Sequence, residues 1–190
     1  MEFSTQWNTH LIEYSVPEFV AVARRAHDLG FETVWLNDNV RYRNIFTVLT
    51  AIAAQVPIRV GTATIVPYFH NPITLACTLA SLSDVCQGRE VRVGIAIGDL
   101  GQTPPYVEFT KRLSMLRECT LFLKEALSGN TAFFREYPTL VRYFRLNPEG
   151  KLKLAFAVPG PLPTRCRITV SAGPLNARRT TPGTRQRPRA

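Results

Sequence analysis

The sequence predicts an α/β fold in which the strands of a parallel sheet alternate with helices. Short apolar runs rich in β-branched residues are followed by longer segments whose apolar residues recur every three or four positions. Four such strand–helix units succeed one another between residues 2 and 127. Because the strands are apolar along most of their length, we expect a parallel sheet that is covered on both faces.

Local signals place the ends of these elements. Ser15 and Glu18 form a capping box at the start of the first helix, and Gly30 lies where a left-handed helix cap is expected. Asn71 and Pro72 give the third helix a cap and a proline in its first position. We therefore expect strands at 2–7, 33–36, 58–66 and 91–97, and helices at 16–29, 45–54, 72–86 and 107–127.

Two architectures are compatible with this order of elements. A doubly wound sheet is complete at this length, whereas a (β/α)8 barrel takes about 250 residues, so that only about half of one is present. A dinucleotide-binding domain has no support, because no G-x-G-x-x-G follows the first strand. In both architectures, ligands bind at the carboxyl ends of the strands.

The positive charge of the chain is concentrated in its last segment. Residues 160–190 contain seven arginines and no acidic residue, so that +2 of the net charge of +9 remains for residues 1–159. The segment is rich in Arg, Thr, Pro and Gly, a composition that cannot form a core, and it predicts a disordered basic tail. Binding of nucleic acid is the weaker hypothesis, because the segment has no aromatic residue on which bases could stack.

We expect neither a membrane span nor a metal centre. The chain has no run of about eighteen uncharged apolar residues, and residues 1–10 lack the basic start and apolar run of a secretory signal. The four cysteines are far apart and form no C-x-x-C pair, which argues against zinc and against a disulfide framework. These features are typical of a protein of the reducing cytoplasm.

The predicted strand ends carry few groups able to do chemistry. Asp38 and Asp99 follow the second and fourth strands and are the only carboxylates there. Each could act as a general base or accept a hydrogen bond from a ligand, and each could instead cap the helix that follows. His70 lies beside Asn71 and is expected to be a neighbour of that helix cap rather than a catalyst.

Several blocks of the sequence, in their order and spacing, resemble the first half of proteins of the luciferase-like monooxygenase superfamily. The main blocks are 26–35, 58–63, 70–72, 79–84 and 94–99. Within the superfamily, the chain is most similar to the coenzyme F420-dependent branch, the methylenetetrahydromethanopterin reductase-like proteins. The resemblance extends over about residues 1–156.

The resemblance implies a partial (β/α)8 barrel of four to five strand–helix units, with a flavin or deazaflavin at the carboxyl-terminal face. It implies hydride transfer with coenzyme F420, or as the alternative monooxygenation with FMN, on a small-molecule substrate. The position of Asp38 contacts the deazaflavin in the family, and that of Ala63–Thr64 is a non-prolyl cis peptide that forms a bulge behind the ring. Gly98–Asp99 corresponds to the strand end that faces the ring and the substrate.

Some residues depart from the family pattern. Asn39 stands where many F420-dependent relatives have a histidine that acts as proton donor, and an amide does not titrate near neutral pH. Val66 stands where a Thr or Asn commonly touches the cofactor. The resemblance thus predicts catalytic positions at Asp38, Asn39 and Asp99, and cofactor contacts at Asp38, Ala63, Thr64, Val66, Gly98 and Asp99.

The last part of the chain departs further. Residues 168–174 resemble strand five and its glycine turn, after which the basic tail replaces the expected helix, so we divide the chain into residues 1–159 and 160–190. We expect an oxidoreductase impaired by C-terminal truncation, with a non-catalytic half-barrel fragment or a partner-dependent subunit as the alternative. An open sheet would uncover inner side chains, which predicts a homo-oligomer or a partner that supplies a missing C-terminal half. The candidates for these side chains are Val34, Val60, Thr62, Val93 and Ile95, and the periodicity leaves open which face of the sheet each one takes.

Overall fold

The computed structural model describes residues 2–7, 14–40, 43–98 and 107–154, and the backbone of residues 166–170. Its centre is a parallel sheet with the strand order β1-β2-β3-β4-β7. These strands are Ser4–Trp7, Thr33–Leu36, Arg59–Ile65, Val91–Ile95 and Cys166–Val170. A doubly wound sheet reverses its strand order at one point, whereas a barrel wall adds each strand beside the last. The order is therefore that of a barrel wall, and the partial (β/α)8 prediction is confirmed.

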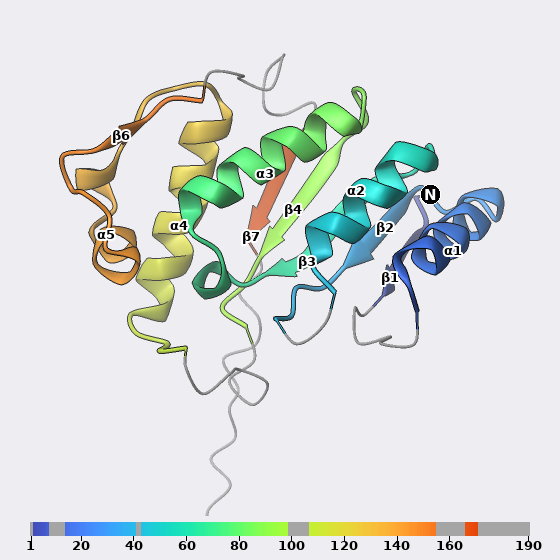
Figure 1. Ribbon diagram of the computed structural model, residues 1–190, viewed down its shortest axis with the longest axis horizontal. Helices are drawn as coiled ribbons and strands as arrows, with labels where there is room; N and C mark the ends of the chain where they lie inside the picture. The colour runs from blue at the N-terminus through green and yellow to red at the C-terminus, as the bar shows by residue number, and fades with distance from the viewer. Residues whose placement is uncertain (1, 8–13, 41–42, 99–106, 155–165, 171–190) are drawn as a thin grey trace, which may run out of the picture.

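Four helices follow one another along one face of the sheet (Figure 1), each packed against the next. They are α1 (Val16–Asp28), α2 (Ile45–Gln55), α3 (Pro72–Val85) and α4 (Arg112–Leu127). The first three agree with the predicted ranges to within one residue. The fourth begins later than predicted, because Lys111 has a φ of 47°, a left-handed conformation that an α-helix cannot contain. None of the described helices is long and apolar enough to cross a membrane.

The predicted caps hold these helices in place. The Ser15 hydroxyl accepts a hydrogen bond from the backbone N–H of Glu18, and the Glu18 carboxylate accepts one from the backbone N–H of Ser15. The Asn71 side chain accepts from the backbone N–H of Ile73 at 3.0 Å. Gly30, just after α1, has a φ of 85°, as expected of a glycine that ends a helix.

The core lies between the sheet and its helices. Val34, Val60, Thr62, Val93 and Ile95 all have 0% exposure, so none of these five candidates lies on the open side of the sheet. The register explains why: the row Trp35, Gly61 and Arg92 alternates with the buried row of Val34, Val60 and Val91. Apolar residues thus face the helices, while an aromatic, a glycine and a cation take the other face.

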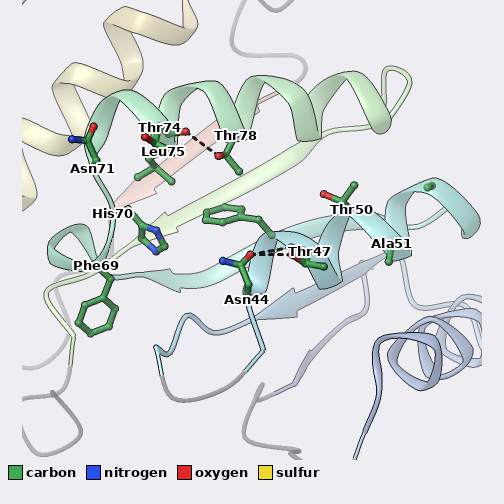
Figure 2. Close-up of a pocket in the computed structure, with 12 residues that line it drawn as sticks. Asn44, Thr47, Thr50, Ala51, Phe69, His70, Asn71, Thr74, Leu75 and Thr78 are labelled. Carbon is green, nitrogen blue, oxygen red and sulfur yellow. Dashed lines mark hydrogen bonds between the residues drawn. The ribbon is translucent and has the colours of Figure 1, made fainter.

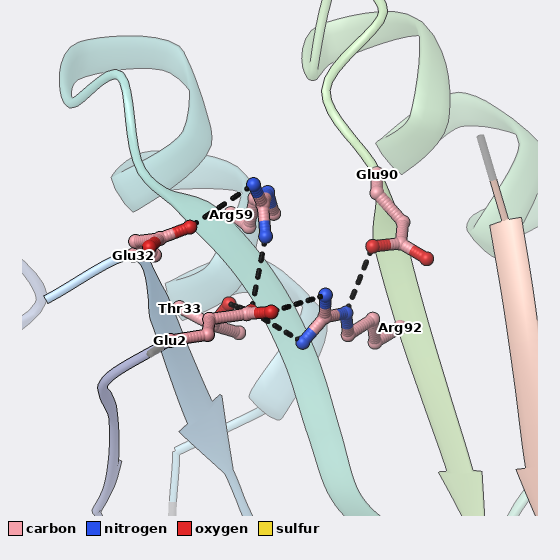
Figure 3. Close-up of polar contacts among 6 residues, drawn as sticks. All are labelled: Glu2, Glu32, Thr33, Arg59, Glu90 and Arg92. Atoms are coloured by element: carbon pink, nitrogen blue, oxygen red, sulfur yellow. Dashed lines mark hydrogen bonds and ion pairs between the residues drawn. The ribbon is translucent and has the colours of Figure 1, made fainter. Parts of the chain in front are cut away.

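An ion-pair network joins the amino-terminal ends of the strands (Figure 3). Glu2 pairs with Arg59 at 3.0 Å and with Arg92 at 2.6 Å, and its carboxylate also accepts a hydrogen bond from the Thr33 hydroxyl. Arg92 extends the network to Glu90 at 2.8 Å. The hydrogen bond from Arg92 lowers the pKa of Glu2 below 4.5. The network therefore links the start of the chain to β2, β3 and β4.

A small unit that the periodicity did not predict follows α4. It consists of the antiparallel pair β5 (Ala132–Phe133) and β6 (Lys151–Leu152) and the short helix α5 (Pro138–Phe144). Two-residue strands and a seven-residue helix are too short to show a hydrophobic period.

Helix α5 is fixed to α4 by the Glu118 carboxylate, which is 6% exposed. It accepts hydrogen bonds from the backbone N–H groups of Thr139 at 2.7 Å and Leu140 at 3.1 Å, and from the Thr139 hydroxyl at 2.6 Å. A side chain from a neighbouring helix thus serves as the cap of α5.

The predicted strand at 168–174 is present as β7, which pairs with β4 over Cys166–Val170. The boundary at residue 159 and the basic tail after residue 170 lie outside the described residues.

Candidate functional site

The carboxyl ends of β2 and β3 bring two of the predicted positions together. The backbone N–H of Asp38, just after β2, donates to the carbonyl oxygen of Thr64 in β3 at 3.1 Å. The backbone N–H of Val66 in turn donates to the Asp38 carboxylate oxygen Oδ2 at 3.2 Å. Asp38 and Thr64 therefore lie at the same edge of the sheet, as predicted. Asp99 lies outside the described residues.

His70 completes the environment of Asp38. The chain makes a short 3-10 turn, η1 (Pro67–Phe69), after β3, and this turn returns His70 over the strand end. The His70 atom Nε2 lies 2.7 Å from Asp38 Oδ2, and the two side chains are 18% and 6% exposed. The Phe46 ring packs edge-on against the imidazole, with centroids 5.5 Å apart. The sequence-based expectation that His70 only adjoins a helix cap missed this contact.

The other side of His70 faces the helical layer. A groove of about 720 Å³ runs between α2 and α3, and His70 lines its end beside Phe69 and Asn71 (Figure 2). Four threonines from the two helices are among its lining residues: Thr47, Thr50, Thr74 and Thr78. His70 therefore lies between a buried carboxylate at the strand ends and a groove open on the helical side.

The end of β3 is irregular where the family pattern places a bulge. The Ala63–Thr64 peptide is cis, as the resemblance implied, and the register with β4 shifts between Thr62 and Ile65. The Thr62 hydroxyl spans the irregularity, since it accepts from the backbone N–H of Gly94 and donates to its carbonyl oxygen, both at 3.0 Å. A Cβ at Gly94 would lie 2.5 Å from the Thr62 carbonyl oxygen, so the strands approach this closely only with glycine there.

Val66 and Gly98 form the adjoining surface. Gly98 has a φ of 89°, and a Cβ built on it would lie 3.1 Å from both Val66 methyl groups. Val66 is 6% exposed, so its side chain packs within the protein while its backbone N–H serves Asp38. On the side of β1, the Gln6 side chain donates to the carbonyl oxygen of Ala63 at 3.2 Å.

Tyr68 anchors the turn that carries His70. Its hydroxyl donates to the carbonyl oxygen of Thr110 at 2.6 Å, and its ring packs against Phe109 and Tyr143 with centroid distances of 4.6 and 5.2 Å. Burial raises the pKa of Tyr68 to about 12, so the phenol stays protonated and acts as a hydrogen-bond donor.

These strand ends have the chemistry to hold a planar ring with N–H groups. Both hydrogen bonds to the Asp38 side chain go to Oδ2. None of the described residues donates a hydrogen bond to the other carboxylate oxygen, Oδ1. A carboxylate oxygen in such a position can accept from a ligand. Gly98 and Ala63 add little side-chain bulk beside it, which permits close approach. Among the described residues, no cluster of three or more His, Cys, Asp or Glu side chains could hold a metal ion.

Comparisons with known proteins agree with this fold. The chain is 25% identical over 131 residues to a 5,10-methylenetetrahydromethanopterin reductase of Archaeoglobus fulgidus, which covers 68% of this chain and 38% of the reductase. Its fold matches a structure of an F420-dependent secondary alcohol dehydrogenase in complex with an F420–acetone adduct (TM-score 0.63, 19% identity, covering 89% of this chain and 51% of that one).

A second solved structure carries FMN. It is the oxygenating constituent of 3,6-diketocamphane monooxygenase of Pseudomonas putida, with a TM-score of 0.63 at 16% identity over 90% of this chain and 51% of that one. The chain thus spans about half the length of these two structures and less of the reductase. The family model of the luciferase-like monooxygenases matches residues 3–170, and the chain therefore belongs to that family.

Proposed function

We propose that this protein is an oxidoreductase that binds coenzyme F420, with FMN as the alternative, at the carboxyl ends of β1 to β4. The observation that carries the proposal is the environment of Asp38, whose Oδ2 takes two hydrogen bonds while Oδ1 takes none from the described residues. Such a carboxylate is held in one orientation before a ligand arrives.

The proposed roles follow from these contacts. A bound deazaflavin supplies two-electron hydride chemistry, and a bound flavin supplies hydride or oxygen chemistry. Asp38 accepts a hydrogen bond from the ring, and the backbone N–H of Val66 fixes the carboxylate. Ala63, Thr64 and Gly98 form the surface against which the ring lies. The proposed substrate-facing role of Asp99 depends on the family pattern alone.

His70 offers a way to move a proton. Asn39 carries an amide, which does not exchange a proton near neutral pH, whereas the ring nitrogen Nε2 of His70 lies 2.7 Å from Asp38 Oδ2 and can pass a proton along that contact. The imidazole also borders the groove between α2 and α3, through which it can exchange protons with solvent. We assign proton handling to the Asp38–His70 pair, and a catalytic role of Asn39 depends on the family pattern alone.

Relatives support both cofactors. The alcohol dehydrogenase structure contains an F420 adduct, and the Pseudomonas putida monooxygenase structure contains FMN. The similarity of the sequence to the methylenetetrahydromethanopterin reductases, which belong to the F420-dependent branch, favours F420. Small-molecule substrates are expected for either chemistry.

Binding of each cofactor to the purified chain tests the proposal. Titration of F420 and of FMN, followed by cofactor fluorescence, should give saturable binding to at least one. Asp38→Asn should weaken that binding at least about tenfold, because a charge-assisted hydrogen bond is lost. The exposed Asp84 on α3 supplies the control, and Asp84→Asn should leave the affinity unchanged.

Two outcomes would contradict the proposal. An unchanged affinity of Asp38→Asn for the cofactor would show that Asp38 is not part of the binding site. If neither cofactor binds, the alternative holds, and the chain is a non-catalytic half-barrel fragment or a subunit that needs a partner. Light scattering on the same sample tests the expected homo-oligomer. A monomer that binds the cofactor would contradict this expectation, because the site would then be complete without a second copy of the chain.

A further inference from the structure

A basic cavity of about 510 Å³ lies between the segment before α4 and helix α5. Three cationic side chains line it, Lys111 from the start of α4 and Arg142 and Arg145 from the end of α5, against one carboxylate, that of Glu108. None of the three cations forms an ion pair with another described residue. The cavity therefore holds more positive charge than its single carboxylate neutralises.

The cavity lies at the same end of the molecule as the candidate site. Strands of the sheet point toward the end where α4 begins (Figure 1). Thr110, which lines the cavity, accepts the hydrogen bond of the Tyr68 hydroxyl, and Tyr143, also in its wall, packs on the Tyr68 ring. Tyr68 comes two residues after Val66, whose N–H holds Asp38.

The local electrostatics favour an anion there. Cations that share one cavity repel one another, and a bound anion relieves that repulsion. The peptide dipoles of α4 add positive potential at its amino end, where the first turn contains Arg112 and no acidic residue. The amino ends of helices are stabilised by acidic side chains and destabilised by cationic ones. The positive charge before α4 therefore destabilises the free protein, and an anionic ligand would offset that effect.

The available donors match an oxyanion in particular. Two guanidinium groups present paired N–H donors suited to phosphate or carboxylate oxygens, and Lys111 adds an ammonium group. Thr110 and Tyr143, which carry hydroxyl groups, also line the cavity, whereas the hydroxyl of Thr139 already donates to Glu118. The volume exceeds that of a single ion and suits an anionic group attached to a larger molecule.

We propose that this cavity binds a phosphate or carboxylate group carried by the cofactor or the substrate. The identity of the carrier rests on the proposed function, but the anion site itself does not. The cavity supplies a positively charged binding point beside the strand-end site, and this point selects acidic ligands over neutral ones.

Binding of inorganic phosphate and of glutarate to the full-length chain tests the site directly, by calorimetry and by thermal shift at constant ionic strength. We expect saturable binding that weakens at least about tenfold in Arg142→Gln/Arg145→Gln. Arg117→Gln/Arg135→Gln, which removes two exposed arginines outside the cavity lining, is the control for net charge and should bind as the parent does. Equal weakening in both double variants, or no saturable binding by the parent, would overturn the proposal.

Two further arms identify the carrier and separate this inference from the proposed function. If the site holds the cofactor phosphate, FMN binds more tightly than riboflavin, and Arg142→Gln/Arg145→Gln removes that difference. If the difference persists while phosphate binding is lost, the anion belongs to the substrate. Asp38→Asn should weaken cofactor binding and leave phosphate binding intact, so that the failure of either proposal is visible without the other.

Discussion

Replacement of Glu118 tests how the small unit after α4 is held. Glu118→Ala removes the acceptor of three hydrogen bonds and leaves the N–H groups of Thr139 and Leu140 unpaired in a buried setting. A buried N–H donor left without an acceptor costs about 1–3 kcal/mol, so two of them lose a large part of the 5–15 kcal/mol that stabilises a typical domain. Glu118→Gln keeps one carbonyl oxygen as an acceptor, but its NH2 group faces another hydrogen-bond donor. We expect this variant to lower the free energy of unfolding by about 1–2 kcal/mol.

Urea unfolding followed by circular dichroism measures these changes in the free energy of unfolding. Hydrogen exchange of residues 138–144 reports separately whether α5 comes loose while α4 stays folded. Glu136→Gln, an exposed change in the same small unit, is the control. An unfolding free energy for Glu118→Ala within about 0.5 kcal/mol of the control, with unchanged exchange in α5, would refute the capping role.

Three other predictions follow from described contacts. Gly94→Ala should cost about 1–3 kcal/mol in urea unfolding, because the new methyl would lie 2.5 Å from a carbonyl oxygen of β3, and unchanged stability would contradict that close approach. Glu2→Gln should lower the melting temperature at neutral pH. The lowered pKa of Glu2 means that its stabilising effect is present above pH 4.5 and is lost as the pH falls through the folded-state pKa, so the melting temperatures should converge in acid. Iodoacetamide at pH 8 should label half-buried Cys77 before Cys119, because burial raises the pKa of the Cys119 thiol to about 12. Peptide mapping that finds Cys119 labelled first would exclude a buried thiol.

The sequence predicted elements whose signals are local. Ser15 and Glu18 lie three residues apart and cap α1 through their own backbone, so the pair is visible in the sequence and present in the structure. The strand at 33–36 has the predicted ends because apolar residues run between an exposed Glu32 and polar Asn37. Such features need no knowledge of the remaining chain.

Features that depend on distant residues were not predictable in the same way. Asp38 and His70 are 32 residues apart, and only the turn after β3 brings them together. A strand that is apolar along most of its length does not show which of its faces meets the helices, and the candidates Val34 and Val60 are buried on the helix side. Glu118 caps a helix twenty residues further along, where no short-range pattern points to it.

The pairing of Glu2 with Arg92 has a consequence for the order in which the chain folds. The two residues are 90 positions apart and meet only when three intervening strands are in register. Closing a loop of that length lowers the conformational entropy of the chain, and contacts between residues nearer in sequence must first form to compensate for that loss. This pair therefore forms late, after the successive strand–helix units have docked. Mutations at Glu2 should then accelerate unfolding and leave the refolding rate nearly unchanged, which makes the first carboxylate of the chain a kinetic reporter of the completed sheet.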